Sequence, residues 1–500
     1  MKKYLKSIFL VLLILTCFCV YGCKVDDPVD NNDDINNNID DDNDNNNDDN
    51  DNDDSNDDNN NDDDQDDSWI DEHECVESDW IDVEEFTCGQ TGDQFTECTI
   101  CGELMNARTY RKQHEYMEEV VKEVTCTENG QTRKYCIYCG NEQLLTDYSK
   151  GHDTNAVAVV KAPSSTENGI KEIRCSKCRE TMRSIEFVNN AYTFNGKLSV
   201  NGRDLVNKFG QKIQLFGLST HGIQWFGRYA NMGTIASLVE GFGINVIRFA
   251  FYTDENGYCD GGKTKQEEML THLYNGIDAA TKLGLYVIID WHMVGAENVA
   301  DKNPLTYLEQ SKEFFSFISE KYKRYDNILY EIMNEPNGST SWADCKKYAN
   351  EVIPCIRKNS DGIILVGNPN WTADLNSVMK DPLTGYKNIM YTYHFYAADH
   401  RHTGQVENAY ENGFPVFISE YGFMNSDGDG AISETYGQNW KKVLDERNIS
   451  YVAWNISNSG GAASIFKKGS SDMIDVSDSN LKEWGIYLKK MYREMAGLDK

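Results

Sequence analysis

Two glutamates in the C-terminal part of the chain have the type and setting that glycoside cleavage needs. Glu335 follows the apolar run Ile328–Met333, and Glu420 ends the apolar run Val416–Glu420. Hydrolysis of a glycosidic bond requires one carboxyl group that protonates the leaving oxygen and a second that attacks the anomeric carbon or activates water. We therefore expect this chemistry at Glu335 and Glu420, provided that the fold brings them to one site.

Neighbouring residues suggest how the two glutamates divide the work. Asn334 could donate a hydrogen bond to a sugar 2-hydroxyl, a bond that strengthens as positive charge builds at the anomeric carbon. Arg248 and Tyr396 could keep Glu420 ionised by charge and hydrogen bonding, as a nucleophile requires. Negative charge nearby would favour the protonated form of Glu335, which would then be the acid. The reverse assignment stays open at this point.

The fold that must position these side chains is indicated by eight short runs of β-branched, aromatic and leucine residues. Amphipathic stretches such as Glu267–Lys282 and Pro304–Tyr325, with apolar residues three and four positions apart, lie between the runs. Strands that alternate with helices form parallel sheets covered on both faces. The eight runs are Ile213–Leu218, Asn245–Phe251, Leu285–Trp291, Ile328–Met333, Gly362–Gly367, Ile389–Phe395, Val416–Glu420 and Tyr451–Asn455.

Eight such units within residues 191–500 predict a (β/α)8 barrel, an α/β fold. Reactive groups of these barrels cluster at the C-terminal ends of the strands, where the polar residues of this region also fall. Arg248, His292, His394, Tyr396 and Trp454 lie at or near such ends. Before the first strand, residues 196–209 are predicted to form a hairpin that closes the bottom of the barrel.

Five segments carry a more specific signal: Ser219–Trp225, Asn245–Arg248, Ile289–His292, Tyr330–Pro336 and Phe417–Gly422. Together they resemble glycoside hydrolase family 5, above all its bacterial endoglucanase branch, subfamily 2, over residues 192–500. The resemblance implies a retaining mechanism through a covalent glycosyl-enzyme on Glu420, with Glu335 as acid and base, and no metal or other cofactor in the barrel. It also implies that further side chains complete the site: Arg248, His292, Asn334, His394, Tyr396 and Trp454.

Aromatic side chains are expected to form the sugar platforms, because the apolar face of glucose stacks on a flat ring. The best candidates are Trp225, Trp371 and Trp454, with His221 and Tyr252 nearby. After the eighth strand this chain has serine and glycine where the family usually has a lysine and an acidic or amide residue. That departure concerns binding on the nucleophile side of the cleft and leaves the chemistry unchanged.

Endo-acting hydrolysis of β-1,4-glucan is the activity that this resemblance implies. Mannanase, xylanase or mixed-linkage glucanase activity on the same barrel is the first alternative, since specificity resides in loops. A surface protein that binds polysaccharide without cleaving it is the second, and the presence of both Glu335 and Glu420 argues against it. The barrel is expected to be monomeric.

The N-terminus resembles an export signal. Lysines at positions 2, 3 and 6 precede the apolar run Ile8–Val20. The segment Val20–Cys23 resembles a bacterial lipobox, so residues 1–23 are predicted to be a signal peptide and Cys23 to carry a lipid. A plain signal peptide cut nearby is the alternative. We expect a secreted protein held at the bacterial surface, with the lipid as its only membrane contact.

The net charge of −33 comes largely from one segment. Residues 26–67 hold 21 Asp and no Lys or Arg. Self-repulsion and the lack of apolar groups predict a disordered tether over residues 24–68. Because no basic surface is available to follow a phosphate backbone, nucleic acid is excluded as a partner.

Residues 69–190 contain three copies of a cysteine-rich repeat of 38–39 residues. A single cysteine precedes a Cys-x-x-Cys pair in the first two copies, and Ser165 replaces that single cysteine in the third. Thiols with a nearby histidine are the ligand types of zinc, whereas thiols in an oxidising compartment form disulfides, and both readings stay open. The serine argues against a strict four-ligand site in every copy. The candidate cysteines are Cys88, Cys98, Cys101, Cys126, Cys136, Cys139, Cys175 and Cys178, with His73, His114 and His152 nearby.

Overall fold

The computed structural model describes residues 73–162, 167–187, 191–295, 302–471 and 474–499. The predicted signal peptide, Cys23 and the acidic tether lie outside these residues. Among the helices of the described ranges, none has the length and the apolar character that crossing a membrane would require.

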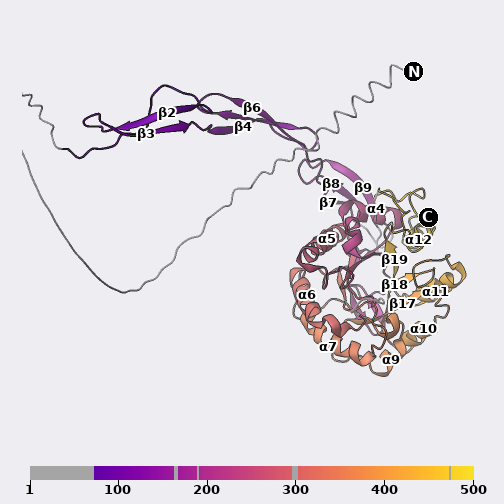
Figure 1. Ribbon diagram of the computed structural model, residues 1–500. Coiled ribbons are helices and arrows are strands. Elements are labelled where there is room, and N and C mark those ends of the chain that lie inside the picture. The colour runs from indigo at the N-terminus through magenta and orange to yellow at the C-terminus, as the bar shows by residue number, and fades with distance from the viewer. Residues whose placement is uncertain (1–72, 163–166, 188–190, 296–301, 472–473, 500) are drawn as a thin grey trace, which may run out of the picture. The chain divides into compact units, whose positions relative to one another are not determined.

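Eight parallel strands close into a barrel, which confirms the predicted fold (Figure 1). The barrel closes at β12, where Gly217 lies opposite Val246 of the second strand and Val452 of the eighth. A Cβ atom at Gly217 would lie 1.8 Å from the Val246 carbonyl oxygen, so only glycine fits there. The strands are β12 (Phe216–Thr220), β13 (Val246–Tyr252), β14 (Tyr286–His292), β15 (Ile328–Glu331), β16 (Ile364–Val366), β17 (Ile389–Tyr396), β18 (Val416–Gly422) and β19 (Tyr451–Ile456).

An outer ring of helices covers the barrel (Figure 1), and each helix buries its apolar side against the strands. The longer ones are α4 (Met232–Phe242), α5 (Gly262–Leu283), α6 (Leu308–Lys321), α7 (Trp342–Arg357), α9 (Leu375–Lys380), α10 (Gly404–Glu411), α11 (Glu434–Arg447) and α12 (Glu483–Ala496). Short turns complete the connections: α2 (Tyr192–Asn195), α3 (Ile223–Phe226), η1 (Gly227–Tyr229), η2 (Pro304–Tyr307) and α8 (Pro369–Thr372).

A small hairpin lies at the N-terminal end of the barrel, as the sequence predicts. Its strands are β10 (Ser199–Asn201) and β11 (Asp204–Val206). Leu198 and Leu205 pack with Leu215 and with barrel-strand residues such as Val452 in one buried cluster. The reactive groups are thereby confined to the opposite end.

The cysteine-rich region forms three antiparallel sheets of three strands each. Each sheet corresponds to one copy of the repeat. The strands are β1 (Ile81–Asp82), β2 (Thr91–Glu97) and β3 (Leu104–Arg111); β4 (Tyr116–Lys122), β5 (Gly130–Cys136) and β6 (Glu142–Asp147); and β7 (Ala156–Lys161), β8 (Gly169–Arg174) and β9 (Thr181–Phe187).

The third sheet packs against helix α4 of the barrel. Ile173, Ile185 and Phe187 are buried in the same hydrophobic cluster as the barrel and its helices. Arg183 forms an ion pair with Glu240 and donates a hydrogen bond of 2.9 Å to the hydroxyl of Ser237. The third copy of the repeat thus shares its core with the barrel, and the boundary at residue 191 stays a prediction.

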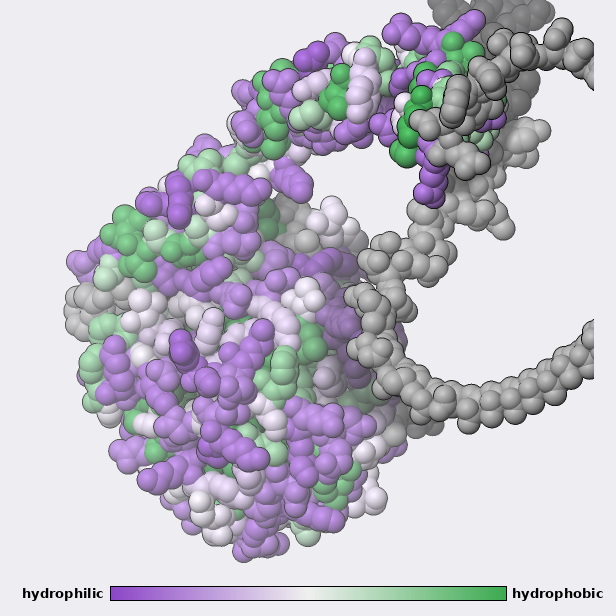
Figure 2. Space-filling view, turned by 90° about the vertical axis from the view of Figure 1, so that its left-hand side faces the viewer, coloured by the Kyte–Doolittle hydropathy of each residue, from purple (hydrophilic) through white to green (hydrophobic). Residues whose placement is uncertain are grey.

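The face of the molecule drawn in Figure 2 is mostly hydrophilic, with hydrophobic residues in small groups. The three-stranded sheets differ, because they expose many apolar side chains along their strands. All seven residues of β4 are exposed, including Met117, Val120 and Val121. The first two sheets therefore bury too little apolar surface to be stable by packing alone, whereas the third shares the core of the barrel.

Candidate active site

The barrel brings the two predicted glutamates together at its C-terminal end. Glu420 lies in β18 and is buried, whereas Glu335 lies in the loop after β15 and is partly exposed. One carboxylate oxygen of each glutamate and one nitrogen of His394 all lie within 4.8 Å of one another. Carboxyl groups about 5–5.5 Å apart are typical of retaining glycosidases, whereas inverting enzymes place them roughly 6.5–9.5 Å apart.

Arg248 crosses the interior of the barrel instead of standing at the end of its strand. It lies within β13, is fully buried, and contacts side chains from four other strands or their loops. Its Nη1 atom donates to Glu420 at 3.2 Å, its Nε atom to Glu331 at 2.7 Å, and its Nη2 atom to Asn334 at 2.6 Å. The guanidinium therefore fixes the nucleophile candidate and the sugar-binding amide relative to each other.

Tyr396 and His394 hold the two glutamates from the neighbouring strand β17. The Tyr396 hydroxyl donates to Glu420 at 2.7 Å. The His394 Nδ1 atom lies 2.8 Å from Glu335, and its Nε2 atom lies 2.9 Å from the hydroxyl of Ser419. Each glutamate thus has a partner that restricts the rotation of its carboxyl group.

Burial raises the pKa of Glu420 above its ordinary value. The nearby positive charges of His394 and Arg248 oppose this rise, as does the hydrogen bond from Tyr396, whereas Glu335 adds to it. Arg248 and Tyr396 therefore act in the direction that the sequence predicts, but burial outweighs them. The Glu420 carboxyl group therefore ionises at a higher pH than the carboxyl group of an exposed glutamate.

Burial lowers the pKa of His394, but the nearby carboxylates of Glu331, Glu335 and Glu420 outweigh burial and raise this pKa to about 9. The folded protein therefore binds a proton at His394 more tightly than the unfolded chain, whose histidines titrate near 6.5. The contribution of protonated His394 to the free energy of unfolding is complete below pH 6.5 and disappears as the pH rises through 9.

We expect His394→Gln to change the pH dependence of stability in that window. The wild-type chain should lose stability relative to the variant between pH 6.5 and 9, and the difference should be constant below pH 6. The free energy of unfolding in urea, measured from pH 5.5 to 9.5, provides the test. The exposed His402, replaced in the same way, is the matched control. A pH-independent difference for His394→Gln would contradict the assigned charge.

His292 and Asn334 form a second hydrogen-bonded unit beside the glutamates. Burial lowers the pKa of His292 well below its ordinary value, so its ring is neutral. Its Nδ1 atom lies 2.5 Å from Asp290, and its Nε2 atom faces the Asn334 amide at 3.4 Å. The Asn334 amide also donates to the Met293 carbonyl at 3.0 Å, which fixes its orientation.

Several residues of this network were not singled out from the sequence, namely Asp290, Glu331, Ser219 and Ser419. All four are fully buried. Asp290 and Glu331 lie 2.9 and 2.7 Å from Arg248, and Ser219 accepts from it at 3.2 Å. Asp290 and Glu331 could have been found from the sequence, because each is a carboxylate inside an otherwise apolar strand. Buried charges are nearly always paired, so such a residue predicts a buried partner.

Aromatic rings line one side of the site. His221, Trp225, Tyr252 and Trp454 form a connected group, and the ring of Trp454 stacks on His292 at 5.3 Å. Trp225 is 43% exposed, as a sugar platform requires, whereas Trp454 is 8% exposed. The predicted platform residues on this side are therefore neighbours in space.

Trp371 lies apart from that group, on the Glu335 side of the site. It lines a cavity of about 400 Å³ together with Glu335, His394, Tyr396 and others. Its backbone is left-handed, with φ 54°, and its amide donates to the Pro336 carbonyl at 3.0 Å. That turn presents a ring that is 51% exposed next to Glu335. The site thus has two separate aromatic surfaces, one at Trp371 beside Glu335 and one in the group that contains Trp225 and Trp454.

The segment after β19 contains a cluster of serine hydroxyls where the family usually has charged or amide groups. Ser457 donates to Asn455 at 2.7 Å, and its hydroxyl lies 3.0 Å from Ser464. Lys482 donates to the carbonyls of Gly460 and Gly461 at 2.7 and 2.6 Å. The lysine here therefore supports the loop backbone.

Comparisons with known proteins agree with this geometry. Endoglucanase A of Butyrivibrio fibrisolvens is 44% identical over 299 residues, which are 59% of this chain and 68% of that protein. An endoglucanase of Clostridium saccharobutylicum is 39% identical over 60% of this chain and 65% of its own length. The solved catalytic domain of Thermobifida fusca endoglucanase Cel5A, in complex with cellotetraose, has a TM-score of 0.56 and 34% identity, and the match covers 60% of this chain and 99% of that one.

The sequence also matches the family described as Cellulase (glycosyl hydrolase family 5) over residues 206–460, slightly more than half of the chain. That range contains all eight barrel strands, together with both glutamates and all of their hydrogen-bonding partners. This chain is therefore a member of glycosyl hydrolase family 5.

Proposed function

We propose that the barrel is an endo-acting, retaining β-1,4-glucanase that hydrolyses cellulose-type glucans by double displacement. The observation that carries this proposal is the short separation of Glu335 and Glu420, since one carboxylate oxygen of each lies within 4.8 Å of the other. That spacing leaves no room for a water between a base and the sugar, as inversion would need. The relatives named above are endoglucanases, which supports the choice of substrate.

In the first step Glu420 attacks the anomeric carbon while Glu335 donates a proton to the leaving oxygen. Arg248 and Tyr396 hold the two oxygens of Glu420, and Asn334 is placed to bind the sugar 2-hydroxyl. In the second step Glu335, now a carboxylate, removes a proton from water, which attacks the glycosyl-enzyme. His394 stabilises that carboxylate because it is charged at neutral pH.

The two separate aromatic surfaces support binding within a chain and not at its end. Trp371 lies beside Glu335, the proposed proton donor, where the leaving part of the glucan would bind. Trp225 belongs to the separate aromatic group with Tyr252, where the other part of the glucan would bind. Rings on both surfaces bind sugar units before and after the cleaved bond. An endo-acting enzyme needs both.

A product profile tests this proposal against the related specificities. The purified full chain should release short oligosaccharides from carboxymethylcellulose and lower its viscosity early, with little release from mannan or xylan. Lichenan contains β-1,4 bonds and should be cut as well. The Glu420→Gln variant is the blank for each substrate. Faster hydrolysis of mannan, xylan or lichenan than of carboxymethylcellulose would replace the proposal with the corresponding specificity.

We also propose that the enzyme is exported and held at the bacterial surface through a lipid on Cys23, with a monomeric barrel behind the acidic tether. The lysine-led apolar run and the lipobox-like segment Val20–Cys23 support this. Mass spectrometry of the N-terminal peptide from the cell envelope tests it, because a lipidated Cys23 adds the mass of its acyl chains. An unmodified N-terminus in the culture medium would contradict the anchor.

A further inference from the structure

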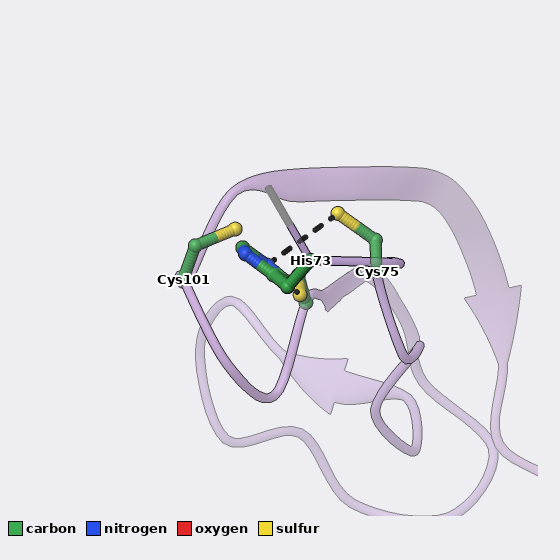
Figure 3. Close-up of side chains that lie close together, drawn as sticks. His73, Cys75 and Cys101 are labelled. Carbon is green, nitrogen blue, oxygen red and sulfur yellow. Dashed lines mark hydrogen bonds between the residues drawn. The ribbon is translucent and has the colours of Figure 1, made fainter. Parts of the chain in front are cut away.

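Three clusters of one histidine and three cysteines lie in the cysteine-rich region, away from the active site. In each cluster the four possible ligand atoms all lie within 4.8 Å of one another. Figure 3 shows the first cluster, in which the sulfur atoms of Cys75 and Cys101 point toward the ring of His73. The clusters are, in order, His73, Cys75, Cys98 and Cys101; Cys88, His114, Cys136 and Cys139; and Cys126, His152, Cys175 and Cys178.

The distances within the clusters fit a tetrahedral ion better than a disulfide. Zinc binds sulfur at about 2.3 Å and histidine nitrogen at about 2.0–2.1 Å, so tetrahedral ligands lie roughly 3.8 Å apart for two sulfurs and roughly 3.5 Å apart for sulfur and nitrogen. The Sγ atoms of Cys88 and Cys136 are 3.7 Å apart, as are those of Cys126 and Cys175. A disulfide would bring each pair to about 2.05 Å.

The sulfur-to-nitrogen distances repeat in all three clusters. His73 lies 3.4 Å from Cys98, and the histidines of the second and third clusters lie 3.4 Å from Cys139 and Cys178. Each cluster also holds an odd number of thiols. A disulfide within any cluster would leave one thiol over, whereas a single ion uses all four groups.

The Cys-x-x-Cys turn has the same backbone in all three copies. The residue after the second cysteine donates its amide to the carbonyl of the first, at 2.8 Å for Gly102, 3.0 Å for Gly140 and 3.0 Å for Arg179. These residues are left-handed, with φ 76°, 70° and 66°. In the first turn, backbone N–H groups of Cys101 and Ile100 also hydrogen-bond to Cys98. The third turn thus keeps the left-handed conformation at Arg179, although an arginine adopts that conformation less readily than a glycine does.

We propose that each cluster binds one zinc ion, and that the ligands of the second and third sites come from two successive copies of the repeat. Cys88, from the loop between β1 and β2, joins the turn between β5 and β6. Cys126, from the loop between β4 and β5, likewise joins the turn between β8 and β9. Zinc supplies the stabilisation that the exposed first and second sheets do not obtain from packing.

This sharing between copies explains the serine of the third copy. The lone cysteine of each copy serves the site of the following copy, and the chain continues after the third copy into the barrel. Ser165, which lies outside the described residues, therefore removes no ligand from any site. The expectation that this serine argues against a four-ligand site in every copy is wrong, because the third site takes its fourth ligand from Cys126.

Metal content of the full chain tests the proposal directly. The purified chain, reduced and titrated with zinc, should retain three zinc ions after removal of the excess. Cobalt in place of zinc should give three sites with the absorption of tetrahedral thiolate coordination. Retention of fewer than three ions would overturn the proposal. So would a chain isolated under non-reducing conditions that lacks zinc and is lighter by two hydrogens for each disulfide.

Paired substitutions test the sharing between copies. Cys88→Ser with Cys136→Ser should remove one zinc ion, because both residues belong to the second site. Cys88→Ser with Cys98→Ser should remove two ions. If each copy instead formed its own site, the two results would be exchanged. The control Cys345→Ser alters a buried cysteine of α7 outside the clusters and should leave three ions bound.

The outcome is independent of the proposed hydrolysis. Activity on soluble glucan should remain in both paired variants, because the glutamates lie in the barrel and not in the altered sites. Retained activity also shows that the barrel of each variant is folded. A chain with three zinc ions and no activity would contradict the proposed function alone.

Discussion

Replacing Glu420 with glutamine should lower kcat on soluble glucan by roughly 10⁵-fold, the scale of losing a catalytic nucleophile. Glutamine keeps the size of the side chain and can still contact Arg248 and Tyr396, but its amide cannot attack the anomeric carbon. Covalent glycosyl-enzyme should therefore be absent. Mass spectrometry of the protein, quenched during turnover of an activated aryl glycoside, measures this.

Glu434, exposed in the first turn of α11, provides the matched control. Glu434→Gln should retain the wild-type kcat and should form the covalent adduct. The adduct on the wild-type chain should map to Glu420. An adduct on Glu335, or a Glu420→Gln variant with more than about a tenth of the activity, would reverse the roles of the two glutamates.

Replacing Glu335 with alanine should impair the two steps differently. Substrates with poor leaving groups need protonation, so their hydrolysis should fall by about 10²–10⁴-fold. An activated aryl glycoside needs little protonation and should still glycosylate Glu420. The intermediate should then accumulate, because no base remains to activate water.

Added azide should restore turnover of the activated substrate by Glu335→Ala, since azide attacks without a base. The product should be a β-glycosyl azide, because two inversions retain configuration. Nuclear magnetic resonance of the product establishes its configuration. The corresponding variant Glu420→Ala should give an α-azide, if any, and so serves as the mirror control. An α-azide from Glu335→Ala would exclude the double displacement.

The barrel could be predicted from sequence because its strands are buried on both faces. Val246–Tyr252 and Tyr286–His292 are continuous apolar runs except for Arg248, Asp290 and His292, and every residue in them is buried. Such continuous apolar runs locate a buried strand even when its neighbours in the fold are not known. The hairpin Ser199–Val206 is only partly buried, and its position before the first barrel strand is what the sequence predicts.

The hydrogen-bonding network around the glutamates could be predicted only in part. The contact of Tyr396 with Glu420 follows from two strand ends that are neighbours in the barrel. The path of Arg248 across the interior does not, because its length lets it reach several strands. The position of Trp371 depends on a left-handed turn at residues 370–372 that no glycine marks.

The grouping of the cysteines could not be predicted from the sequence, because in a repeated sequence each lone cysteine can be assigned to its own copy or to the next one. Cys88 and Cys126 lie near their own Cys-x-x-Cys pairs in sequence, and simple proximity assigns each to its own copy. The order of the strands decides otherwise, since the loop that carries each lone cysteine lies at the opposite end of its sheet from the turn of that pair. Only the three-dimensional arrangement of successive sheets separates the two groupings.

The contact between the third sheet and α4 determines how mechanical load would enter the enzyme. If the chain is held at Cys23 while the barrel grips a fibre, tension along the polypeptide meets β9 before it meets the barrel strands. The ion pair of Arg183 with Glu240 and the buried ring of Phe187 join that sheet to the barrel. Part of the force would thus be borne by a side-chain interface against α4 that includes neither Glu335 nor Glu420.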